Sequence, residues 1–351
     1  MKHSDAVGVL EKRTPQRVIT LEEHFTTPAF LQATSRFVPA AGRSTVLEAK
    51  LLDLGEARIE AMNEGGIDLQ ILSLYAGGAE ALPADQATAL VREANDMAFA
   101  ATETHPDRLA CFATLALKDP HGAAIELERG VSKLRCVGGF LNGTEGGSFL
   151  DDPRYTPIFE AAEALDTPLY LHPAPPFATV RDAYFGGLPE KSAFFLSTAA
   201  WGWHAELGMH CLRLILSGLF DRFPKLRIII GHMGEGLPFS LLRAQDGLPP
   251  SVTNLQRSVS EYFLDHFFVT TSGYFTQPPF RCAMDVLGPE RILYSVDYPY
   301  RSNVAGAKFL AALNVAQGDL EKITHGNAER ILKLVPTKLT VSSSRESHGH
   351  R

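Results

Sequence analysis

The sequence predicts a single (β/α)₈ barrel, in which parallel strands alternate with helices. Eight apolar runs rich in β-branched residues follow one another along the chain, and helical patterns separate most of them. The alternative is a doubly wound open sheet, but no G-x-G-x-x-G motif follows an early strand. The expected strands cover residues 18–21, 69–75, 109–115, 136–143, 168–173, 226–232, 267–273 and 291–297.

The strands and helices differ in pattern. The strand runs are continuously apolar, as expected for parallel strands with both faces covered. Several helical patterns begin with Asp-Pro, which favours a helix start. They cover residues 56–66, 86–105, 119–134 and 154–166.

Two long connections interrupt the alternation, residues 25–50 after the first strand and residues 174–204 after the fifth. Connections that follow the carboxyl ends of barrel strands lie over the active-site face. We therefore expect both to form pocket walls or lids. Around this barrel domain (residues 18–336) we expect an N-terminal extension (1–17) and a disordered tail (337–351).

Composition excludes several classes of partner. The chain is 45% hydrophobic and 21% charged, with a net charge of −7 and no cluster of basic residues. Nucleic acid and anionic membranes are therefore poor partners. The four cysteines lie far apart, without zinc or disulfide spacing, and neither a signal peptide nor a membrane helix is apparent. We expect a cytoplasmic protein with reduced thiols.

Metal-ligating residues end four of the predicted strands. Glu22 and His24 end the first strand and share one face because they are two residues apart, whereas Glu23 points the other way. The others are His172, His232 and Asp297. Such ends converge at the mouth of a barrel, and imidazole with carboxylate suits Zn²⁺ or Mn²⁺, with Mg²⁺ also open.

Each residue alone also has a structural interpretation. His24 or His172 could be a hydrogen-bonded core histidine, Asp297 could cap a helix, and His232 with Glu235 could form a simple ion pair. In the segment GHMGEG (231–236), however, Glu235 is placed to hold one nitrogen of His232 and leave the other for a proton. The histidines in helices or loops are expected to be structural: His105, His121, His204, His210, His266 and His325.

Several motifs resemble one family from end to end. They are LEEHF, LYLHP, LSGLFDRFP, IIIGHMGEGLPFSLLR, VTTSGYF, RILYSVDYPY and GNAERILKL. Together they resemble the amidohydrolase-related decarboxylases, in particular the branch of gamma-resorcylate decarboxylase and its relatives that act on 2,3-dihydroxybenzoate and carboxyvanillate. The Glu-x-His start separates this branch from hydrolytic relatives that begin with His-x-His.

The resemblance implies a non-oxidative decarboxylase of a small hydroxylated aromatic carboxylate, with no organic cofactor. It implies a divalent metal ion that the substrate chelates, with His232 and Glu235 as a proton-handling pair and Asp297 as the acid that protonates the ring carbon. The implied metal ligands are Glu22, His24, His172 and Asp297. Relatives are commonly dimers or tetramers, so a homodimer or homotetramer is expected.

Four further residues are candidates for substrate binding. Phe37 and Arg243 match an aromatic and an arginine position of the family, and Tyr298 and Tyr300 follow Asp297. Three stretches depart from the family pattern: HPAPP after the fifth strand, the two tyrosines in place of Trp-Pro-Phe, and LLRAQDG. These departures concern the substrate and leave the metal chemistry intact.

Two other functions fit the same residues. In a metal-dependent hydrolase of an ester, lactone or amide, His232 or Asp297 would activate a metal-bound water. A metal-binding scaffold without catalysis is the third interpretation, although structural sites tend to close their coordination with protein ligands.

Overall fold

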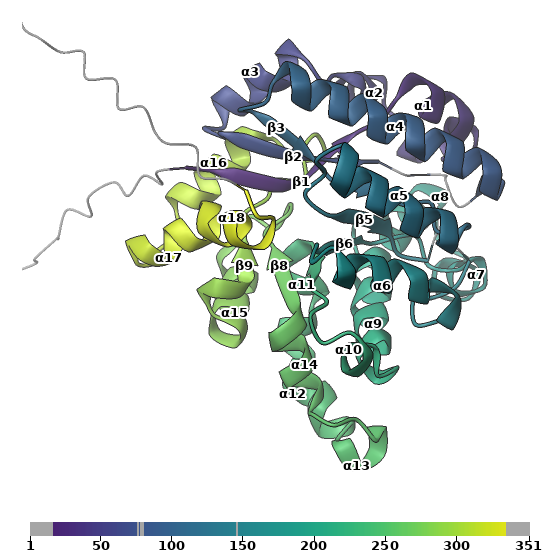
Figure 1. The fold of residues 1–351 in the computed structure, drawn as a ribbon, viewed down its shortest axis with the longest axis vertical. Coiled ribbons are helices and arrows are strands. Elements are labelled where there is room, and N and C mark those ends of the chain that lie inside the picture. Colours follow the sequence, from purple (N-terminus) through teal and green to yellow (C-terminus); the bar gives the residue numbers. More distant parts are fainter. Residues whose placement is uncertain (1–16, 76, 78–80, 145–146, 335–351) are drawn as a thin grey trace, which may run out of the picture.

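The computed structural model describes residues 17–75, 77, 81–144 and 147–334 (Figure 1). The expected tail and all but Arg17 of the expected N-terminal extension lie outside the described residues. None of the described helices combines the length and apolar character that a membrane span needs.

All eight predicted strands are present, and they pair in parallel. The run at 109–115 forms two short strands separated by Phe112, and the others each form one. The strands are β1 (Ile19–Phe25), β2 (Leu69–Leu74), β3 (Leu109–Cys111), β4 (Ala113–Thr114), β5 (Gly139–Asn142), β6 (Leu169–His172), β7 (Ile228–Ile230), β8 (Phe267–Thr270) and β9 (Ile292–Leu293).

Hydrogen bonds join these strands into the predicted barrel. Ladder pairing gives the orders β1-β2-β3 and β4-β5-β6-β7-β8-β9. Phe112 links the two sets, because its amide donates to Leu72 while the next amide, of Ala113, donates to Gly138. On the other side, the His24 amide donates to the Tyr298 carbonyl at 2.7 Å, which joins β1 to the segment after β9.

Helices surround the strands (Figure 1). They are α3 (Glu56–Glu64), α4 (Ala84–Thr104), α5 (Pro120–Lys133), α6 (Thr156–Ala164), α9 (Gly202–Leu216), α10 (Leu219–Arg222), α12 (Leu237–Gly247), α13 (Pro250–Thr253), α14 (Val259–His266), α15 (Gln277–Leu287), α16 (Asn303–Ala311), α17 (Gln317–Glu321) and α18 (Asn327–Ile331). A large apolar core lies between the helices and the strands, and a smaller one, which includes Ile19, Leu21 and Phe140, fills the barrel.

The two long connections are helical. The first contains α1 (Pro28–Thr34) and α2 (Thr45–Leu52), and the second contains α7 (Ala178–Phe185) and α8 (Glu190–Ser197). Thr27 and Ser44 cap the first two helices through their side chains. A single turn, α11 (His232–Glu235), follows β7.

Candidate active site

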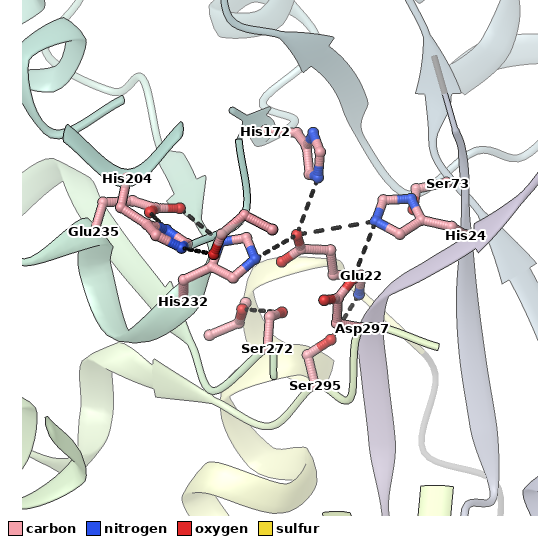
Figure 2. Close-up of polar contacts among 12 residues, drawn as sticks. Glu22, His24, Ser73, His172, His204, His232, Glu235, Ser272, Ser295 and Asp297 are labelled. Atoms are coloured by element: carbon pink, nitrogen blue, oxygen red, sulfur yellow. Dashed lines mark hydrogen bonds and ion pairs between the residues drawn. The ribbon is translucent and has the colours of Figure 1, made fainter. Parts of the chain in front are cut away.

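Glu22 lies at the centre of a buried cluster of imidazoles (Figure 2). Its Oε1 atom is 3.3 Å from Nε2 of His172, 3.7 Å from Nε2 of His232 and 4.0 Å from Nε2 of His24. These residues belong to β1, β6 and the turn after β7. The structure therefore brings together side chains that are distant in the sequence.

Asp297 approaches the same cluster from the segment after β9. Its Oδ1 atom is 3.4 Å from Nε2 of His24. The side chain of Asp297 is 16% exposed, whereas that of Glu22 is fully buried. Asp297 is therefore the carboxyl group on the open side of the cluster.

An extra residue in β1 directs Glu22 toward the cluster. Thr20 pairs with Gln70 and Glu23 with Leu72, so three steps along β1 match two steps along β2. Such a β-bulge reorients the side chains that follow it. Leu21 lies in the core inside the barrel, so regular alternation would turn Glu22 outward.

Tyr170 supports Glu22 from the barrel interior. Its ring stacks on Phe140 with centroids 5.3 Å apart and lies 5.6 Å from the ring of Phe112. Its hydroxyl donates to Oε2 of Glu22. On the same side, a Cβ atom at Gly231 would lie only 2.5 Å from Oε2. One carboxylate oxygen is thus fixed by the barrel, and the other faces the imidazoles.

Burial and charge act in opposite directions on these groups. Burial raises the pKa of Glu22, but His232, His172 and His24 outweigh it and hold that pKa well below its usual range. Burial lowers the pKa of His24 to about 4 and also lowers the pKa of His172, so both imidazoles are neutral at pH 7. Burial, together with the charge of Glu22, raises the pKa of Asp297 to about 7.

The cluster has the donor atoms that a divalent cation needs. Oε1 of Glu22 is buried and has no hydrogen-bond partner among the described residues, which is unusual for a buried carboxylate oxygen. Ser73 Oγ lies 3.1 Å from Nδ1 of His24, which leaves Nε2 directed at the cluster. Imidazole nitrogen with carboxylate oxygen suits Zn²⁺ or Mn²⁺. The residues present therefore fit a metal ion.

His232 and Glu235 lie in a left-handed turn. The four residues of α11 have φ angles of 49°, 56°, 81° and 57°, and Gly236 follows with 76°. Consecutive residues with positive φ cost conformational energy and are found at functional sites. Nδ1 of His232 lies 2.7 Å from Oε1 of Glu235, so that Nε2 faces Glu22.

His204 belongs to this site and is not the purely structural histidine that its sequence context predicts. Its Nδ1 atom lies 2.5 Å from Oε2 of Glu235, and its ring centroid is 4.8 Å from that of His232. No spacing rule links His204 to Glu235, which is 31 residues away. The one available signal was its position at the end of the second long connection, the expected pocket wall.

Glu23 points away from the cluster, as expected from strand alternation. Its carboxylate accepts from the backbone amides of Val296 at 2.9 Å and Tyr298 at 3.1 Å. Glu23 therefore ties β1 to the segment that carries Asp297. No motif or spacing in the sequence indicates this role of Glu23.

The four candidates for substrate binding differ in position. The Tyr300 ring lies 5.6 Å from the ring of His24, beside the cluster. Tyr298 is buried, and the guanidinium of Arg58 lies 5.0 Å from its ring centroid, so the structure shows it in packing. Phe37 is 37% exposed in the first long connection, and Arg243 is exposed on α12 outside the cluster.

The fold and the site define a barrel enzyme with carboxylate and imidazole groups at the carboxyl ends of its strands. The amidohydrolase family model matches residues 51–334, and the chain belongs to this family. This confirms the expected family and the barrel fold.

Similar proteins point to one branch of the family. The gamma-resorcylate decarboxylase of Rhodococcus jostii (strain RHA1) is 39% identical over 91% of this chain and 99% of its own. Among solved structures, a dihydroxybenzoic acid decarboxylase from Polaromonas sp. JS666 with bound manganese and 2-nitroresorcinol has a TM-score of 0.82 at 35% identity, covering 91% of this chain and 97% of that one. The 5-carboxyvanillate decarboxylase from Sphingomonas paucimobilis has a TM-score of 0.83 at 33% identity, covering 91% and 99%. The expected class of enzyme, a carboxy-lyase, is confirmed.

Proposed function

We propose that this chain catalyses the metal-dependent, non-oxidative decarboxylation of a hydroxylated aromatic carboxylic acid. The observation that carries the proposal is the buried Oε1 atom of Glu22, which accepts no hydrogen bond from the described residues and faces three imidazole nitrogens, with Asp297 on the open side. The likeness to decarboxylases of dihydroxybenzoates over most of the chain supports the reaction.

Glu22, His24, His172 and Asp297 would hold the metal ion. A bound divalent ion would orient the substrate and stabilise negative charge on its oxygens. Manganese is bound in the Polaromonas relative, which supports Mn²⁺ here, and the donor set suits Zn²⁺ as well.

The reaction requires one proton for each molecule of substrate. A proton is added to the ring carbon that bears the carboxylate, the bond to that carboxylate breaks, and CO₂ leaves as the ring becomes aromatic again. Asp297 is the proposed acid because it is the carboxyl group on the open side, while Tyr170 and the imidazoles enclose Glu22. The pair of His232 and Glu235 holds a second proton beside the cluster.

An aromatic side chain beside His24 supports an aromatic substrate. The Tyr300 ring lies 5.6 Å from the ring of His24. Tyr300 also lines a small pocket under the first long connection, together with apolar residues such as Leu31 and Leu51 and charged ones such as Arg43 and Glu48. A flat, ring-shaped substrate would pack well against the Tyr300 ring.

A substrate panel tests this function. Protein loaded with Mn²⁺ or Zn²⁺ is incubated with hydroxybenzoates, and CO₂ and the phenol products are measured. Release of CO₂ from at least one member is expected. Aryl esters and lactones are tested in parallel, and their hydrolysis without any decarboxylation would replace this proposal with the hydrolase.

We also propose that the chain forms a homodimer or homotetramer in the cytoplasm. Phe239 and Leu242 on α12 are 89% and 63% exposed, and Trp201 is 62% exposed. Exposed apolar side chains of this size favour contact with a second copy of the chain. The sulfurs of Cys111 and Cys136 lie 3.6 Å apart as free thiols, which suits a reducing compartment. Light scattering with Phe239→Glu as the variant tests the assembly.

A further inference from the structure

His204 presents both ring nitrogens to acceptors. Nε2 lies 3.0 Å from the carbonyl oxygen of Ala199, and Nδ1 lies 2.5 Å from Oε2 of Glu235. A carbonyl oxygen only accepts hydrogen bonds, so Nε2 of His204 carries a proton. At 2.5 Å, a proton must also lie between Nδ1 and the carboxylate oxygen, because two lone pairs would repel each other.

The hydrogen bonds among His204, His232 and Glu235 require one proton more than two neutral imidazoles and a carboxylate carry. The contacts require a proton on Nε2 of His204, one between His204 and Glu235, and one between His232 and Glu235. Two neutral imidazoles and an ionised carboxylate carry only two protons. The third proton makes His204 an imidazolium or Glu235 a carboxylic acid.

The surroundings disfavour a protonated Glu235. Burial raises the pKa of Glu235, but His232 and His204 outweigh it and lower that pKa. The titratable groups that face His204 are His232 and Glu235 of α11 and Tyr274 after β8, whose ring lies 5.4 Å away. Glu235 is the one carboxylate among them.

His204 also lies between solvent and the cluster. Ala199, which accepts from its Nε2 atom, is exposed, whereas the His204 side chain is only 9% exposed. On the other side, Glu235 connects His204 to His232, whose Nε2 atom faces Glu22 (Figure 2). His204 therefore contacts an exposed residue on one side and Glu235 on the other.

We propose that His204 and Glu235 hold one proton in reserve behind His232, and that His204 is a positioning residue that keeps Glu235 directed at His232. This inference rests on the proposed decarboxylation, which consumes one proton per turnover and must recover it from solvent. A second metal ion is the other use of these residues, since His204, His232 and Glu235 lie close enough to share one. Two ligands of one ion are normally about 3 Å apart, however, so the 2.5 Å contact favours a proton.

Two substitutions separate proton storage from hydrogen bonding. His204→Gln can still donate a hydrogen bond to Glu235 but cannot carry the extra proton, and His204→Phe can do neither. His210→Gln is the matched control, because His210 is a buried histidine on the same helix whose Nε2 accepts from the Leu150 amide, outside the cluster.

The expected result for His204→Gln is a kcat about tenfold lower above neutral pH with little change in KM. The loss should be restored by added imidazole buffer or by lower pH. His204→Phe should lose more and His210→Gln should retain the wild-type kcat. Wild-type kcat in His204→Gln at every pH would overturn the proposal.

A measurement on the wild-type chain does not depend on activity. Nitrogen NMR of the labelled, metal-loaded protein should show both ring nitrogens of His204 protonated. A neutral His204 beside an ionised Glu235, or two metal ions per chain by elemental analysis, would overturn the proposal. If no substrate is decarboxylated, the proposed function fails, while this spectrum still decides the proton count.

Discussion

Nδ1 of His232 lies 2.7 Å from Oε1 of Glu235, and both residues have positive φ angles. The left-handed turn places two side chains three residues apart in contact and directs the remaining nitrogen of His232 at Glu22. The strained backbone of this turn thus fixes one imidazole beside the side-chain cluster around Glu22.

Replacement of Glu235 should reduce turnover without unfolding the chain. In Glu235→Gln, both His232 and His204 lose a charged partner, and we expect kcat to fall by roughly ten- to a hundredfold. Glu128→Gln, at an exposed position of α5, is the control. Steady-state kinetics with circular dichroism checks this, and an unchanged kcat would remove Glu235 from the mechanism.

Gly231→Ala should displace the central carboxylate. The new Cβ atom would lie 2.5 Å from Oε2 of Glu22, so Glu22 must move away from the imidazoles. We expect metal content and activity to fall together. Gly247→Ala is the matched control because nothing lies within 4 Å of its Cβ position. Elemental analysis checks this. An unchanged metal content in Gly231→Ala would contradict the assignment of Glu22 as a metal ligand.

His172 and Asp297 should fail in different ways. His172→Ala removes a nitrogen 3.3 Å from Oε1 of Glu22, so both turnover and metal content should be lost. Asp297→Asn keeps the shape but cannot supply a proton, so turnover should be abolished. Metal analysis and CO₂ release measure the two effects separately. Turnover near the wild-type level in Asp297→Asn would show that another group is the acid.

His210 should make stability depend on pH. Burial lowers its pKa from 6.5 to about 3, and its Nε2 atom accepts a hydrogen bond from the Leu150 amide at 2.8 Å. The unfolded chain therefore binds more protons between pH 6.5 and 3. The contribution of His210 to the free energy of unfolding is complete above pH 6.5. It is lost as the pH falls from 6.5 toward 3, by at most about 1.4 kcal/mol per pH unit.

Unfolding titrations test the His210 contribution. The free energy of unfolding of His210→Gln should fall less steeply below pH 6.5 than that of the wild type. His121→Gln, at an exposed position of α5, should keep the wild-type slope. Equal slopes in the His210 variant and the wild type would show that His210 does not contribute.

The sequence predicted the strands because burial on both faces leaves a simple pattern of apolar runs. It also placed Glu22, His24, His172 and Asp297 at strand ends, which a barrel brings to one mouth. The barrel topology supplies that convergence, so no contact between specific atoms had to be predicted.

The remaining features depend on three-dimensional detail. The bulge in β1 follows from its register with β2, which a single strand does not encode. His204 reaches Glu235 only because α9 packs beside α11, and no local motif encodes that contact. Arg243 is a candidate for substrate binding on the basis of the sequence, and it lies exposed on α12.

The hydroxyl of Tyr170 donates to Glu22 while its ring packs on Phe140 inside the barrel. Tyr170 therefore belongs both to the active site and to the apolar core inside the barrel. Loosening that filling by heat or by a smaller residue at Phe140 would disturb the carboxylate at once. Loss of catalysis and loss of the folded state should accordingly occur at the same temperature, with no inactive but intact barrel in between.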